Sequence, residues 1–218
     1  MNANTVFGAR AVPPWRSGLA RILAAIAVPL IWIGNWLGRV SSWLVLIIVF
    51  VVLTTVLMNA VGWNELLRWD GKVLLLGEAI TINSVTEMQW HLFGLLTLIG
   101  GSYALHADTH VRVDIVHHRL GPAGKHWVDI VGHLVFLIPF CVLVAWMSQH
   151  FVSMSYMSGE QSNYGGLTDR YLIKGALPAG LALLALSALG QVFDRLARIL
   201  DPSLEPPSAN PEQEADHA

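Results

Sequence analysis

Charged residues are scarce in this sequence. Asp, Glu, Lys and Arg make up 13% of the 218 residues, whereas soluble domains carry about 25%. Four stretches contain none of these residues: 40–64, 88–107, 130–159 and 175–193. Each stretch meets or approaches the roughly 20 apolar residues that a helix needs to cross about 30 Å of hydrocarbon. So little charge cannot cover a soluble globule of this size, and the sequence indicates an integral membrane protein.

Other absences exclude several classes of function. Cys141 is the only cysteine, so there is no disulfide framework and no cysteine-based metal site. The net charge of −2 excludes a broad basic face for nucleic acid. The chain has no phosphate loop of the Walker type, no nucleophile elbow and no zinc-protease motif. Because no ionised residue lies near the middle of a predicted span, the chain also lacks what an ion or proton carrier needs. We expect neither an enzyme nor a cofactor, but a partner for a larger permease.

The apolar runs predict an all-α integral membrane protein with four transmembrane helices and an N-terminal amphipathic interfacial helix. The runs are apolar on every side, and the backbone within lipid must satisfy its own hydrogen bonds, which favours helices. An apolar stretch at 73–76, in the first loop, is expected to rest on the membrane surface. The expected segments are a mobile lead at 1–14, the interfacial helix at 15–39, spans at about 40–62, 88–107, 127–151 and 175–193, and a disordered, acidic, Pro-rich tail at 199–218.

The segment 15–39 has two interpretations. Its apolar residues form a helical stripe from Leu19 to Leu37, and Pro29 predicts a kink. One interpretation is a helix that lies in the headgroup plane. The other is a fifth span, since 22–38 carries no charge. We favour the interfacial helix because Gly34, Asn35 and Gly38 weaken the apolar window.

The distribution of Lys and Arg predicts the orientation. Nine of these residues lie in the N-terminal segment, the second loop and the exit of the fourth span, against four in the first and third loops. Positive loops stay in the cytoplasm. We therefore expect both termini and the second loop to be cytoplasmic.

Nine histidines suggest a haem or metal site as an alternative. His91 with His150, or His106 with His133, lie at similar depths and could hold a haem b, as in a four-helix anchor subunit of an oxidoreductase. His106 and His110 have the i, i+4 spacing of a metal pair. We favour structural or solvated roles for these residues and predict no metal site.

Two polar segments stand out from the rest of the chain. ADTHVRVDIVHHRLG, at 107–121, follows the second span and contains Arg112 and Asp114. SGEQSNYGGLTDRYLIKGALP, at 158–178, precedes the fourth span, and its two adjacent glycines permit a tight turn. Two charges of the second segment, Glu160 and Lys174, lie near the membrane edge, where they could pair with one another or with a partner.

These segments carry a resemblance to a known family. The order of four spans, HVRVDIVHHRLGP on the inner side and GEQSNYGGLTDRYLIKGALP on the outer side resembles the small, DctQ-type permease subunit of tripartite ATP-independent periplasmic (TRAP) transporters. The wording is nearest to the branch labelled mannitol/chloroaromatic. The resemblance covers roughly Trp43 to Arg198. Thr168 departs from the pattern, because relatives often have Pro after the GGL motif.

The resemblance implies partners and a location. In this family the small subunit lies in the bacterial inner membrane and pairs with a large, many-spanned permease subunit of the DctM type, which a sodium gradient drives. A periplasmic substrate-binding protein delivers the substrate, typically an organic acid. The small subunit would be a scaffold that steadies the moving subunit.

The resemblance also suggests roles for six residues. We expect Arg112 and Asp114 to hold the inner loop against neighbouring helices. Glu160, Gly165, Gly166 and Lys174 would shape the outer face near the docking binding protein.

Overall fold

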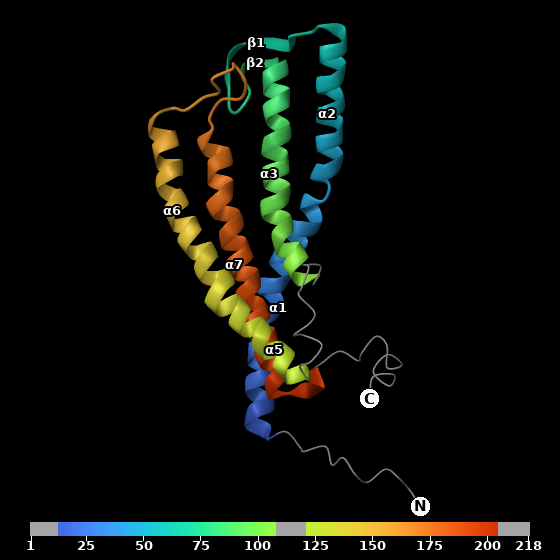
Figure 1. The fold of residues 1–218 in the computed structure, drawn as a ribbon, viewed down its shortest axis with the longest axis vertical. Coiled ribbons are helices and arrows are strands. Elements are labelled where there is room, and N and C mark those ends of the chain that lie inside the picture. The colour runs from blue at the N-terminus through green and yellow to red at the C-terminus, as the bar shows by residue number, and fades with distance from the viewer. Residues whose placement is uncertain (1–12, 108–120, 205–218) are drawn as a thin grey trace, which may run out of the picture.

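The computed structural model describes residues 13–107 and 121–204, which form an elongated bundle of long helices (Figure 1). The α-helices are α1 (Pro14–Ser41), α2 (Leu44–Val61), α3 (Ile82–His106), α5 (Pro122–Val131), α6 (Ile138–Met157) and α7 (Tyr171–Leu200). A π-helix, Gly132–Leu137, joins α5 to α6, and a short 3-10 turn, Pro202–Leu204, follows α7.

Three helical stretches within the described residues are long and apolar enough to cross a membrane: Pro14–Val61, Ala123–Met157 and Tyr171–Leu200. The fold is therefore mostly helical, but the predicted four spans with a separate interfacial helix are not confirmed. Helix α3 does not reach the same apolarity, because it carries Gln89 and His91 in its first half. It nevertheless lies between α2 and α7 (Figure 1) and contacts both.

The prediction of an all-α protein holds for most of the described residues, but it did not include a β-hairpin. Strand β1 (Glu65–Val73) pairs antiparallel with β2 (Gly77–Thr81) at one end of the bundle. The stretch 73–76, which was expected to rest on the membrane surface, forms the end of β1 and the hairpin turn. Leu75 takes a φ of 70° there, a left-handed conformation that residues with a Cβ seldom adopt. For that reason a turn at this position was not predicted from the sequence.

Helix α1 packs lengthwise on the bundle. It contacts α7 and α3 and runs along the long axis of the molecule below α2 (Figure 1), whereas a helix in the headgroup plane would lie across that axis. The side chains that α1 buries are all small: Ala20, Ala27, Gly34, Gly38 and Ser41. The interfacial position predicted for 15–39 is thus not confirmed.

Glycines allow close approach of the helix backbones. A Cβ added at Gly34 would lie 2.1 Å from Ser187 Oγ on α7, and one at Gly190 would lie 2.9 Å from the Cβ of Leu30 on α1. A Cβ at Gly180 would lie 2.7 Å from the Cβ of Leu98 on α3. Small residues play this role in membrane helix pairs. The sequence analysis considered Gly34 only as a residue that weakens the apolar window, and the structure shows that it also permits close packing.

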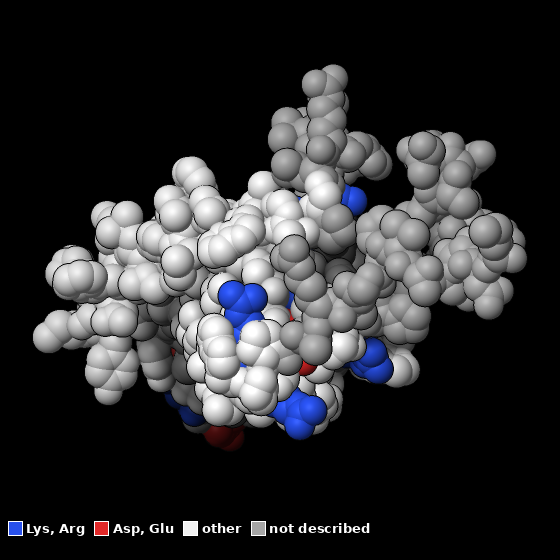
Figure 2. All heavy atoms as spheres, turned by 90° about the horizontal axis from the view of Figure 1, so that it is seen from below, with Lys and Arg blue, Asp and Glu red and all other residues white. Residues whose placement is uncertain are grey.

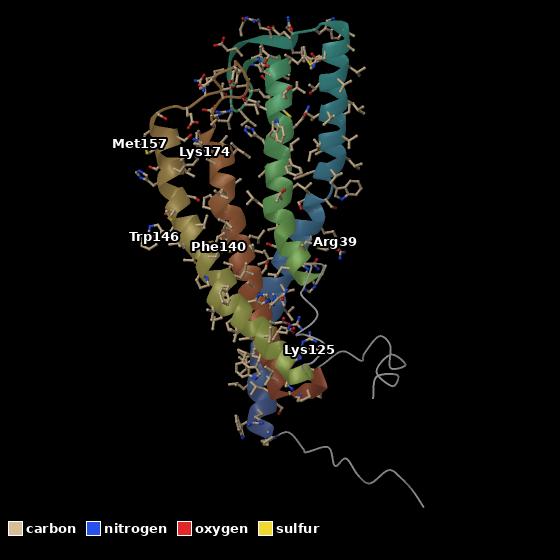
Figure 3. All side chains as sticks on the ribbon, viewed as in Figure 1. Arg39, Lys125, Phe140, Trp146, Met157 and Lys174 are labelled. Atoms are coloured by element: carbon tan, nitrogen blue, oxygen red, sulfur yellow. The ribbon has the colours of Figure 1, made fainter. Side chains whose placement is uncertain are left out.

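Large apolar side chains point outward. Trp146 and Met157 project from α6 away from the bundle (Figure 3) and are 72% and 84% exposed. Along α2, Leu46 and Phe50 are exposed in the same way. A water-soluble protein does not display apolar surface on this scale, so these faces are suited to lipid or to another membrane subunit.

Candidate functional site

The connection between α6 and α7, residues 158–170, lies beside the β-hairpin and the start of α3 (Figure 1). Four of the six residues singled out from the sequence belong to this connection or to the first turn of α7. They meet an acidic residue of α3, Glu87, which the sequence analysis did not select. We call the group formed by Glu87, Glu160, Ser162, Leu167, Arg170 and Lys174 the Glu87 cluster.

Glu160 and Lys174 pair with one another. The Lys174 Nζ donates a hydrogen bond to Glu160 Oε2 and lies 3.9 Å from the centre of the Phe151 ring, a cation–π contact. Lys174 lies near the start of α7 (Figure 3). Arg170 supports the pair, since its backbone N–H donates to the Glu160 carbonyl at 3.2 Å and its Nη1 lies 4.0 Å from Glu160 Oε1. The hydrogen bond from Lys174 lowers the pKa of Glu160 from its ordinary value.

The structure requires glycine at positions 165 and 166 for different steric reasons. Gly165 has a φ of +67°, which favours a residue without a Cβ. Gly166 has ordinary φ, but a Cβ there would lie 2.5 Å from Glu87 Oε2. The tight turn expected from this pair is present, and the second glycine also makes room for the carboxylate.

Glu87 is the acceptor that holds the connection in place. Its carboxylate accepts hydrogen bonds from Ser162 Oγ, from the Leu167 N–H at 2.9 Å and from Arg170 Nη2 at 3.5 Å. The Glu87 side chain is only 16% exposed. The sequence analysis assigned no role to Glu87. The available signal was a single acidic residue at the start of a span, facing a loop rich in glycine.

The connection is also fixed to the hairpin. The Thr168 N–H donates to the Leu75 carbonyl at 2.9 Å, and Thr81 Oγ1 donates to the Gly165 carbonyl at 3.0 Å. The Leu167 side chain is fully buried. Asn83 Nδ2 donates to the Tyr164 carbonyl at 2.6 Å. Hairpin, connection and α3 therefore form one ordered surface instead of separate loops.

Some side chains of this surface are paired with one another and others are exposed. The charged groups of the Glu87 cluster pair with one another, and these pairs stabilise the connection. Tyr164, by contrast, is 78% exposed at the tip of the connection, and the Arg68 side chain of β1 is 70% exposed. Across the part of the chain that the structure describes, no group of three or more His, Cys, Asp and Glu side chains could hold a metal ion.

The other two predicted residues, Arg112 and Asp114, lie outside the described residues. At the end of the bundle that contains the last turns of α7, the structure shows ion pairs that the sequence analysis missed. Arg195 Nη2 lies 3.4 Å from Asp129 Oδ2, which joins α7 to α5. Arg198 Nε donates to Asp194 Oδ2 at 2.8 Å within α7. Seen from below, this end displays several groups of basic atoms and little acidic surface (Figure 2).

One of the histidines considered for haem has a structural contact. His133 Nε2 lies 3.2 Å from Gln191 Oε1, and Gln191 Nε2 donates to the Leu105 carbonyl at 2.7 Å. These two bonds tie the π-helix, α7 and the end of α3 together. Such a contact agrees with the structural role favoured for His133.

A comparison with protein families decides the class of protein. Residues 74–198 match the family described as "Tripartite ATP-independent periplasmic transporters, DctQ component", which is more than half of the chain. The chain belongs to this family. No curated protein matches it, and no solved structure does.

Membership in the DctQ family gives the described site its setting. The protein is the small permease subunit of a TRAP transporter, a transport component and not an enzyme, and a tripartite transporter implies partner subunits. The matched range begins at the hairpin turn and includes the whole Glu87 cluster. The family assignment takes the place of the haem-anchor alternative.

Proposed function

We propose that this DctQ component is a membrane brace for a large permease subunit of the DctM type. The observation that carries the proposal is the distribution of charge. Between Lys174 and Asp194 helix α7 has no ionised residue, and α2 and α6 have none at all. A chain with its charges at the helix ends and apolar side chains outside offers a partner a large rigid face. It offers an ion no path of its own.

In this proposal α3 is the fourth span. It has 25 residues, which at about 1.5 Å each exceed the roughly 30 Å of hydrocarbon. Its polar side chains are compatible with lipid where they have partners inside the bundle. Gln89 Nε2, for example, donates to Thr55 Oγ1 of α2 at 2.6 Å. The four spans would then be α2, α3, the α5–α6 helix and α7, with α1 packed against their inner half.

The proposed orientation places the Glu87 cluster in the periplasm and both termini in the cytoplasm. The separate groups of basic atoms seen in Figure 2 support this arrangement, since positive residues stay on the cytoplasmic side. The ordered surface around Glu160, Gly165, Gly166 and Lys174 would then face a periplasmic substrate-binding protein. Arg112 and Asp114 would hold the inner loop against neighbouring helices.

Uptake would be driven by an ion gradient, and the solute would be an organic acid or a related small molecule. The resemblance of GEQSNYGGLTDRYLIKGALP to the mannitol/chloroaromatic branch supports this assignment.

Reconstitution tests the brace. The chain is co-expressed with the large permease subunit, and the complex is placed in liposomes with a sodium gradient and the binding protein. We expect copurification, uptake by the complex and no uptake by this chain alone. Glu160→Gln and Lys174→Met should lower uptake, with Glu78→Gln on β2 as the control. Transport by the isolated chain would refute the brace, and unchanged uptake and pairing in both variants would remove Glu160 and Lys174 from the docking face.

Cysteine labelling tests the orientation. In a Cys141→Ala background, Tyr164→Cys places a thiol at the exposed tip of the connection, and Arg16→Cys places one near the start of α1. A membrane-impermeant maleimide should label Tyr164→Cys in intact cells and Arg16→Cys only after the cells are opened. Labelling of both positions in intact cells would contradict the proposed orientation.

A further inference from the structure

A cavity of about 380 Å³ opens between α1, the end of α3 and the last turns of α7. One side of it is apolar, with Val28, Ile31 and Trp32 of α1. The other side is polar, with residues from three helices. None of these residues belongs to the Glu87 cluster. The polar lining residues are Asn35, His106, Gln191, Asp194, Arg195 and Arg198.

The depth of the cavity corresponds to a headgroup layer. Lys174 and Asp194 are about 20 residues apart on α7, which is roughly 30 Å of helix and the thickness of the hydrocarbon core. If Lys174 lies at one surface of the membrane, Asp194 and the two arginines after it lie at the other. Glu87 and His106 on α3 have nearly the same separation. The apolar wall would then face acyl chains, and the polar wall would lie at the membrane surface.

The rim of the cavity is open and aromatic. Val28 and Trp32 are 65% and 60% exposed although they line the cavity. The Trp32 and Trp36 rings stack on the outside of α1, with centres 6.1 Å apart. These apolar side chains face outward from α1, so a molecule that enters the cavity would do so from the lipid side.

The charges of the polar wall are balanced. Arg198 is paired with Asp194, and Arg195 with Asp129. Each guanidinium has five N–H donors in a fork that matches phosphate oxygens, so one acidic partner does not saturate it. The Asp194 carboxylate likewise has acceptor sites beyond those that Arg198 occupies. The cavity is therefore suited to a group that accepts hydrogen bonds from arginine and donates to Asp194.

We infer that this cavity binds the headgroup of an aminoalkyl phospholipid, with phosphatidylethanolamine as the matching chemistry. The phosphodiester lies against Arg195 and Arg198. The ammonium group donates to the Asp194 carboxylate, and the acyl chains leave along Val28 and Trp32. A zwitterionic headgroup fits two arginines that are each paired with an acid better than an anionic headgroup does, because it brings no excess charge. The inference rests on the proposed membrane placement of α7.

Native mass spectrometry of the full-length protein in detergent tests the site. The protein is delipidated and titrated separately with phosphatidylethanolamine, phosphatidylcholine and phosphatidylglycerol. Phosphatidylcholine keeps the phosphate but has no N–H donor, and phosphatidylglycerol tests for simple anion preference. We expect the first bound molecule of phosphatidylethanolamine to bind at least tenfold more tightly than phosphatidylcholine. Equal binding of these two lipids, or tighter binding of phosphatidylglycerol, would overturn the inference.

Variants localise the effect. Arg198→Gln and Asp194→Asn should reduce the affinity for phosphatidylethanolamine to that for phosphatidylcholine. Arg16→Gln, which removes a positive charge from α1 away from the cavity lining, should leave it unchanged. Trp32→Ala, at an exposed position, gives a second readout if a buried substitution unfolds the protein, and it should weaken binding severalfold. An equal loss in Arg16→Gln and Arg198→Gln would mean general electrostatic attraction and would refute a defined site.

A soluble headgroup separates lipid from free phosphate. Glycerophosphoethanolamine has the same polar atoms without acyl chains, so it should compete only at concentrations at least a hundredfold higher than the lipid. Competition at equal concentration would assign the cavity to a soluble phosphate compound and overturn the lipid assignment. Failure of the whole lipid series would leave the brace untouched, because copurification with the large subunit measures that function separately.

Discussion

Glu87 shows how one buried carboxylate can organise a loop from another part of the chain. Its three donors come from a side-chain hydroxyl, a backbone amide and a guanidinium, all within residues 162–170. A carboxylate can accept all three at once because it has only acceptor sites. The neutral amide of glutamine cannot, since its NH₂ group would face at least one donor.

Glu87→Gln should therefore destabilise the connection. We expect a loss of about 1–3 kcal/mol, the cost of leaving a buried donor without an acceptor, and faster tryptic cleavage at Arg170. Thermal unfolding in detergent and timed proteolysis measure the two effects. Glu78→Gln, an exposed acidic residue of β2, is the control and should behave like the native chain. A Glu87→Gln protein with native stability and native cleavage would contradict the role given to this carboxylate.

The pair of Glu160 and Lys174 predicts a dependence of stability on pH. Because the pKa of Glu160 is lower in the folded protein than its ordinary 4.5, the unfolded chain binds more protons than the folded one. The pair's contribution is complete above the ordinary pKa and is lost as the pH falls through the folded value. Melting temperatures from pH 7 downward should show this loss below about 4.5.

Lys174→Met is the matched variant, because it removes the cause of the lowered pKa and keeps the length of the side chain. It should melt at a lower temperature than the native chain at pH 7, and the difference should shrink as the pH falls below 4.5. The Glu65–Arg68 pair of β1 also lowers a carboxyl pKa, so Arg68→Met serves as the reference for a pair outside the cluster. A constant difference at all pH values would argue against the Glu160–Lys174 pair as its source.

At the scale of elements, composition predicted which segments are apolar but not how they pack. The apolar stripe from Leu19 to Leu37 predicted a helix in the headgroup plane. In the structure the small residues of α1 are buried and several large ones, including Ile22 and Ile26, are exposed. In water the larger apolar residues would be buried. In a membrane the contact between helices is made by whatever lets their backbones approach, so size and not hydrophobicity decides the inner face.

The hairpin and the π-helix were missed for local reasons. Strand β1 has irregular pairing with β2 and contains few alternating apolar residues, so the period of a strand is absent from its sequence. The π-helix precedes Pro139, which has no N–H to donate to the previous turn. The N–H of the preceding residue, Ile138, donates to the carbonyl of His133, five residues back, which is the hydrogen bond of a π-helix. A wider turn before a proline has no pattern of its own in the sequence, so the π-helix was not predicted.

The packing of α1 on α7 predicts a specific cross-link. In a Cys141→Ala background, Leu30→Cys with Gly190→Cys should form a disulfide in membranes under mild oxidation, because a Cβ at 190 lies 2.9 Å from that of Leu30 and only a small shift gives disulfide geometry. The control pair is Ile33→Cys with Gly190→Cys, since Ile33 is exposed on α1. A link in the control at the same rate, or none in the first pair, would favour a helix that lies apart from α7.

At the scale of the whole molecule, the helices are longer than the membrane is thick. The continuous stretch 14–61 has 48 residues, and Ala123–Met157 has 35. At about 1.5 Å per residue, roughly 20 would cross the hydrocarbon. Because the hairpin and the 158–170 connection end the bundle on one side, the excess length lies on the other side. That side contains the first half of α1, α5 and the last turns of α7.

The contacts between α1 and α7 give the expected depth of α1 residues in the membrane. Leu30 lies against Gly190, about four residues before Asp194, so Leu30 would be some 6 Å inside the inner edge of the hydrocarbon. Leu19 lies eleven residues earlier on α1, which places it roughly 10 Å beyond that edge. Phe50 of α2, by contrast, would lie within the hydrocarbon. Helix α1 would then neither cross the membrane nor lie flat on it, but enter its inner half along α7.

Fluorescent labels on introduced cysteines measure these depths. In a Cys141→Ala background, a bimane label on Phe50→Cys should be quenched most strongly by lipids brominated along the acyl chain. The same label on Leu19→Cys should be quenched by a water-soluble quencher and little by those lipids. Both positions are exposed, at 71% and 48%, so labelling should not disturb the core. Strong quenching of Leu19→Cys by mid-chain bromine would mean that α1 is a full span. The N-terminus would then lie on the opposite side of the membrane from the end of α7, and the even number of crossings proposed for the brace would be wrong.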